Sequence, residues 1–104
     1  MHNSEEYRQF QENLKSVLNT QHGRHVIWHL LEMCNVFSIS YTGDVNSTIF
    51  NEGTRSAGNM ILREINAADE TKYLIMQQEN IDRKNINKAL KEKEDEIKRT
   101  NEAI

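Results

Sequence analysis

The chain has 104 residues, of which 37% are hydrophobic and 28% charged, and its formal net charge is −3. This length allows one small domain, and the acidic balance argues against a dedicated nucleic-acid binder, which usually carries a basic excess to neutralise phosphates. Proline is absent and only four glycines occur, which favours helices joined by short links over a turn-rich β fold.

Two further features bear on the compartment. The single cysteine, Cys34, cannot form an internal disulfide, which indicates a reducing environment. No apolar run approaches the ~18 residues needed to cross a bilayer, and the start MHNSEEYRQF is too polar for a signal peptide. We therefore expect no membrane association.

The first predicted helix covers residues 4 to 19, with Ser4 as its cap. Helical spacing predicts one core stripe along it, formed by Tyr7, Phe10, Leu14, Val17 and Leu18. Gly23 then ends this helix or loosens the start of the next. A second helix is predicted from about residue 22 to 36, and its apolar face comprises Val26, Ile27, Leu30, Leu31 and Cys34.

Residues 36 to 46 alternate between apolar and polar side chains, as a strand would, at Phe37, Ile39 and Tyr41. No second strand is evident nearby, so we interpret the segment as an extended connection that lays its aromatic side chains on the helices. The alternative is that it adds a strand to the sheet of a partner.

The third predicted helix runs from about residue 47 to 67, capped by Asn46, Ser47 or Thr48. Its broad apolar face comprises Ile49, Phe50, Gly53, Ala57, Met60, Ile61, Ile65 and Ala68. Gly53 and Ala57 stand four apart in the middle of this face. Each glycine costs a helix about 1 kcal/mol relative to alanine, so we interpret the pair as a groove that admits another backbone closely. Gly58 either marks a second contact edge or is simply tolerated.

Glu64 falls inside the same apolar face. It either reaches water from near the helix end or pairs with an arginine such as Arg24 or Arg55.

A fourth helix follows Asp69, with packing residues at Tyr73, Leu74, Met76 and Ile81. Twelve of the eighteen residues from Asp82 to Arg99 are charged. We therefore divide the chain into a helical domain at 1–80 and a charged helical extension at 81–104. The sparse apolar residues of the extension form a thin seam that a partner would complete, at Ile86, Leu90 and Ile97.

Catalytic motifs are not evident. EGTRSAG is not preceded by a strand or followed by a lysine, as a phosphate-binding loop requires, and no serine lies in a nucleophile-elbow motif. We expect no enzymatic activity and no cofactor. His22, His25 and His29 cluster on one face of the second helix, which leaves a metal-binding protein as one alternative. Trp28 lies off the main apolar face, so it is either a contact anchor or covered by a later helix.

The stretch from Gly23 to Ile65 resembles a family of small tailed-bacteriophage proteins found in podophages and prophages and often encoded among virion-assembly genes. The matching features are GR with Trp28 and paired leucines, then Cys34, Phe37, and EG-x-R-x-x-G from Glu52 to Gly58. The similarity covers about residues 7 to 79. It implies a phage protein of structural or virion-associated role, with no known catalytic residues. In that light Arg24, Glu52 and Arg55 form a structural ion-pair set that fixes the second helix against the third.

Together these observations predict an all-α domain of three or four helices with a projecting, charged C-terminal helix. The expected function is that of a non-enzymatic phage structural or assembly protein, located in the virion or the host cytoplasm. The expected partners are other phage proteins or a second copy of the chain, and nucleic acid is not expected. The alternative is a phage protein that binds a host factor. The predicted contact residues are Trp28, Gly53, Ala57, Ile86, Leu90 and Ile97.

Overall fold

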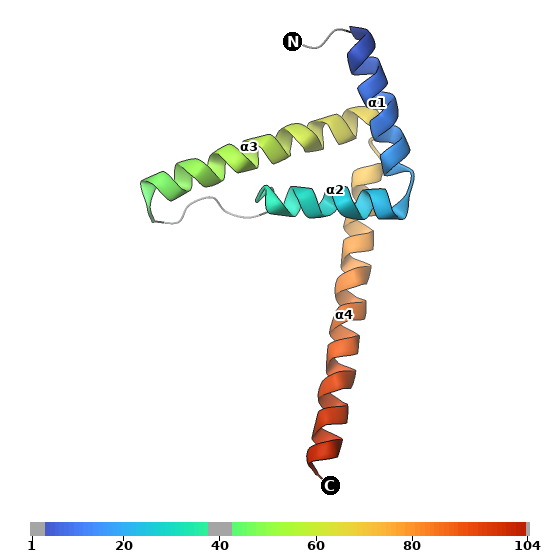
Figure 1. Ribbon diagram of the computed structural model, residues 1–104, viewed down its shortest axis with the longest axis vertical. Coiled ribbons are helices and arrows are strands. Elements are labelled where there is room, and N and C mark those ends of the chain that lie inside the picture. Colours follow the sequence, from blue (N-terminus) through green and yellow to red (C-terminus); the bar gives the residue numbers. More distant parts are fainter. Residues whose placement is uncertain (1–3, 38–42, 104) are drawn as a thin grey trace.

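A computed structural model describes residues 4–37 and 43–103 of the chain. Its helices are α1 (Ser4–Leu18), α2 (Gln21–Met33), α3 (Val45–Ala68) and α4 (Lys72–Glu102) (Figure 1). The described ranges contain helices and turns and no strand. The predicted all-α class and the long charged C-terminal helix are therefore confirmed. The alternation at Ile39 and Tyr41 lies outside the described residues.

The helix boundaries follow from local hydrogen bonds. Thr20 caps α2, because its hydroxyl accepts from the Gly23 amide at 3.0 Å. Asp44 caps α3 in the same way, accepting from the Ser47 amide at 3.0 Å. The sequence prediction placed this cap two or more residues too late. Before α4, Asp69 accepts from the amide and hydroxyl of Thr71, so it orders the turn and does not cap the helix.

The end of α2 is a Schellman turn. Asn35 takes the left-handed conformation with φ 59°, the Asn35 amide donates to the Glu32 carbonyl, and the Val36 amide donates to the Leu31 carbonyl. This turn stops the helix and directs Val36 back onto the core.

The helices form a flat, elongated body with a projecting arm. α2 and α3 lie side by side and run in opposite directions, α1 packs across both, and α4 starts against them and then runs away (Figure 1). The Cα extents are 68 × 39 × 16 Å and the radius of gyration is 18.9 Å, against about 13 Å for a compact domain of similar length.

The core lies where the four helices meet. Six hydrophobic side chains are buried there, one or two from each helix: Leu14, Leu18, Trp28, Leu31, Ile65 and Met76. The sequence prediction was wrong about many other residues that it placed in the core. These residues are half-exposed or exposed: Tyr7, Phe10, Val17, Val26, Leu30, Ile49, Phe50 and Met60. Each helix therefore buries only part of its apolar face.

α4 is continuous across residue 80. Buried or partly covered residues occur along it as far as Arg83, and every described residue from Lys84 onward is exposed. The division into 1–80 and 81–104 stays a prediction about domains.

Candidate protein interface

Trp28 belongs to the core and is not a surface anchor. Its side chain is 5% exposed, because it stacks on Phe37 at a ring-centroid distance of 4.7 Å and on Tyr73 of α4 at 6.1 Å. The indole Nε1 is buried and has no hydrogen-bond partner within the described ranges. The placement of Trp28 among the contact residues is thus wrong, and the covering helix is α4.

Arg24 pairs with α4 and not with α3. Its Nε donates to Glu79 Oε1 at 2.8 Å and one terminal nitrogen donates to Oε2 at 2.9 Å. The other terminal nitrogen donates to the Leu18 carbonyl at 2.9 Å, near the end of α1. One guanidinium therefore joins α1, α2 and α4. The predicted set of Arg24, Glu52 and Arg55 does not form, since Arg55 bonds Glu52 at 3.0 Å within α3.

Burial and charge act together at this ion pair. The side chains of Arg24 and Glu79 are 15% and 16% exposed. The hydrogen bonds from Arg24 hold the pKa of the Glu79 carboxyl below its ordinary value, although partial burial opposes this, and the same pairing raises the pKa of Arg24. The carboxylate is thus ionised and matched at neutral pH. Sequence reasoning missed Glu79, although it lies three residues after the buried Met76 on the packed face of α4.

The close packing on α3 occurs at Gly58, against the side chains of Val36 and Cys34, and not at Gly53. A Cβ added to Gly58 would meet Val36 Cγ2 at 2.3 Å and Cys34 Cβ at 2.6 Å, whereas one added to Gly53 would meet nothing within 4 Å. Gly58 is buried, while Gly53 and Ala57 are exposed. Among residues 4–37 and 43–103, no other helix lies in the groove predicted at Gly53 and Ala57, and its role as a partner surface stays a prediction.

Glu64 of α3 forms hydrogen bonds with the N-terminal half of α1. Its Oε2 accepts from the Tyr7 hydroxyl and from Gln11 Nε2, both at 2.7 Å. Arg24 and Arg55, the two arginines considered in the sequence prediction, instead bond Glu79 and Glu52. The Glu64 carboxylate is satisfied by neutral donors, and the bond to Glu64 raises the pKa of Tyr7.

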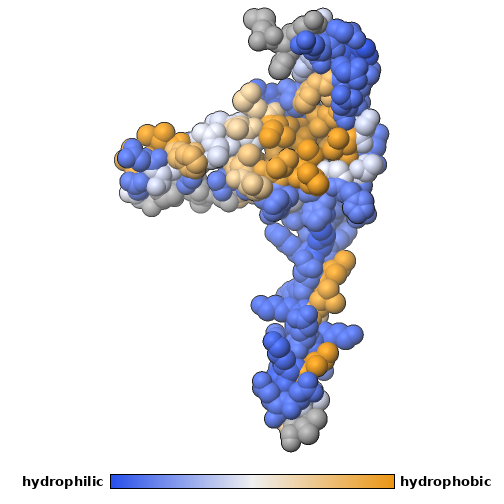
Figure 2. All heavy atoms as spheres, in the orientation of Figure 1, coloured by the Kyte–Doolittle hydropathy of each residue, from blue (hydrophilic) through white to orange (hydrophobic). Residues whose placement is uncertain are grey.

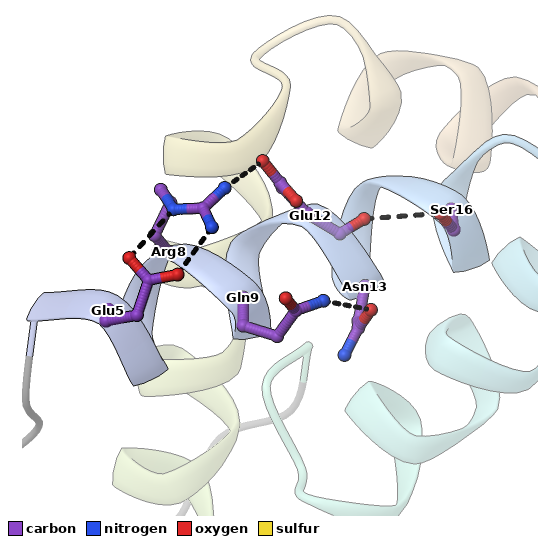
Figure 3. A network of polar contacts seen from close by, with 6 residues as sticks. All are labelled: Glu5, Arg8, Gln9, Glu12, Asn13 and Ser16. Carbon is purple, nitrogen blue, oxygen red and sulfur yellow. Dashed lines mark hydrogen bonds and ion pairs between the residues drawn. The ribbon is translucent and has the colours of Figure 1, made fainter.

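Several apolar faces remain uncovered on the body. They include Phe10 and Val17 on α1, Val26, Leu30 and Met33 on α2, and Ile49, Phe50 and Met60 on α3. Figure 2 shows hydrophobic side chains gathered over the region where α1, α2 and α3 meet. The other side of α1 is polar, with Arg8 bridging Glu5 and Glu12, Gln9 bonded to Asn13, and Ser16 bonded to the Glu12 carbonyl (Figure 3).

The predicted seam on α4 is exposed along its length. Ile86, Leu90 and Ile97 are 58%, 55% and 52% exposed, and Figure 2 shows hydrophobic side chains set among hydrophilic ones along the arm. Nothing within the described residues covers this seam. Whether a partner does so stays a prediction.

A shallow cleft of about 300 Å³ opens between α2 and α4. Trp28, Phe37 and Ile81 supply its apolar lining, and Glu32 and Lys84 lie at its charged margin.

The metal hypothesis gains no support from geometry. Across residues 4–37 and 43–103, which include His22, His25 and His29, no group of three or more His, Cys, Asp or Glu side chains could hold a metal ion. In the same ranges, every helix is too short or too polar to span a membrane.

The fold and its surfaces define a small, elongated all-α protein with several uncovered apolar faces. The chain belongs to the Bbp19-like phage protein family, whose model matches residues 14–78, more than half of the chain. The matched segment starts at the first buried residue of α1 and ends just past Met76, so it contains the whole core. The resemblance to a phage protein family is thereby confirmed. Searches among curated proteins and among solved structures gave no match.

Proposed function

We propose that this phage protein is a non-enzymatic structural or assembly component of the virion that acts through protein contacts. Its membership of a phage protein family supports the viral setting. The amount of surface that the folded chain leaves uncovered supports the mode of action.

That surface is large for the mass. A compact monomer of 12.2 kDa is expected to expose about 6,000 Å², whereas this chain exposes 8072 Å². Part of the excess belongs to the projecting half of α4, and part to the apolar faces of the body. Exposed apolar faces of this kind mark contact sites on soluble proteins.

The arm and the stripe on α3 are the proposed contacts with other phage proteins. Ile86, Leu90 and Ile97 form the seam on α4, and a second helix packed along it would stabilise a segment that has no tertiary support of its own. Gly53 and Ala57 leave a low point on α3 between Phe50 and Met60 where another backbone could lie close.

The test is quantitative mass spectrometry of virions purified from the phage that encodes this chain. The expected result is a constant copy number per particle, or a constant amount in assembly intermediates. A phage carrying Leu90→Glu and Ile97→Glu should lose incorporation while the protein still folds. Lys88→Glu provides the control, because it changes the net charge by the same amount at an exposed position of the arm roughly 160° around α4 from Leu90.

Absence of the protein from both particles and intermediates would contradict the proposal. Recovery of the protein with a host factor in the same infected cells would then identify the alternative, a host-directed phage protein.

A further inference from the structure

We draw no further inference here: the strongest candidate, the shallow cleft between α2 and α4 that Trp28, Phe37 and Ile81 line, carries nothing, because nothing in the described part of the chain shows what fills it.

Discussion

Replacing Arg24 by methionine tests whether the ion pair between α2 and α4 holds the arm to the body. The change removes two hydrogen bonds to Glu79 and one to the Leu18 carbonyl. It leaves a carboxylate whose side chain is only 16% exposed without its main countercharge. Arg83 and His25 lie near enough to compensate in part, since both act to lower the pKa of Glu79.

The expected loss follows from how far the pair is buried. Removing one partner of a fully buried pair costs about 3–5 kcal/mol, whereas exposed pairs contribute about 0–1 kcal/mol. For a pair that is mostly but not fully covered, we expect Arg24→Met to lower the free energy of unfolding by about 2–4 kcal/mol. A small domain has only about 5–15 kcal/mol in total, so the effect is readily measured.

The assay is urea unfolding followed by the fluorescence of Trp28, which is the only tryptophan and is stacked in the core. All variants are compared at one protein concentration, because self-association would couple to stability. Arg8→Met is the control, since it breaks an exposed network on α1 and should lower the free energy of unfolding much less than Arg24→Met does.

A double variant separates the ion pair from simple packing. Arg24→Met with Glu79→Leu leaves no uncompensated charge, so it should recover most of the loss. The reasoning is refuted if Arg24→Met lowers the free energy of unfolding no more than Arg8→Met does. It is also refuted if the effects of Arg24→Met and Glu79→Leu on that free energy simply add in the double variant.

Three further predictions use the same unfolding measurement. Gly58→Ala should lower the free energy of unfolding by about 1–3 kcal/mol, because the added Cβ has no room. Gly53→Ala should leave that free energy unchanged or raise it by up to about 1 kcal/mol. Equal effects of the two variants would count against the close approach at Gly58. Asp44→Ala should lower the urea midpoint through loss of the α3 cap, and an unchanged midpoint would contradict this. The folded-state pKa of Glu79 lies below its ordinary value of 4.5, so the unfolded state takes up a proton first as the pH falls. Stability should therefore decrease from about pH 5 downward, and a Glu79→Gln variant with the same acid slope as the wild type would rule out this contribution.

Much of the architecture was accessible from local patterns. Helical spacing placed Leu14, Leu18, Leu31, Ile65 and Met76 on apolar faces, and all five are buried. The absence of proline and the charge density after Asp82 indicated a long solvated helix, which α4 is. These features depend on residues close together in the chain, so a sequence reports them directly.

Some local signals were present but were not used. Asp44 stands directly before α3 and acts as its cap. Asn35 followed by Val36 is typical of a Schellman ending, and that turn is what brings Val36 onto Gly58. With this turn recognised, Gly58 would have been favoured over Gly53 as the site of close approach.

The partner of Arg24 and the burial of Trp28 were not accessible in this way. Both depend on α4 returning across α2, a contact between residues more than forty positions apart. Apolar residues lie on more than one side of α2, so periodicity alone left the choice of buried side open.

Propensity and spacing indicated three or four helices with a charged arm, and the family resemblance indicated a phage protein, because all of these are properties of the chain read in order. The side of each helix that is covered, the carboxylate that meets Arg24 and the glycine that is crowded became evident only from the packing of the helices. The physical reason is that an apolar face is satisfied by any neighbour of suitable shape, and the identity of that neighbour depends on how all four helices pack at once.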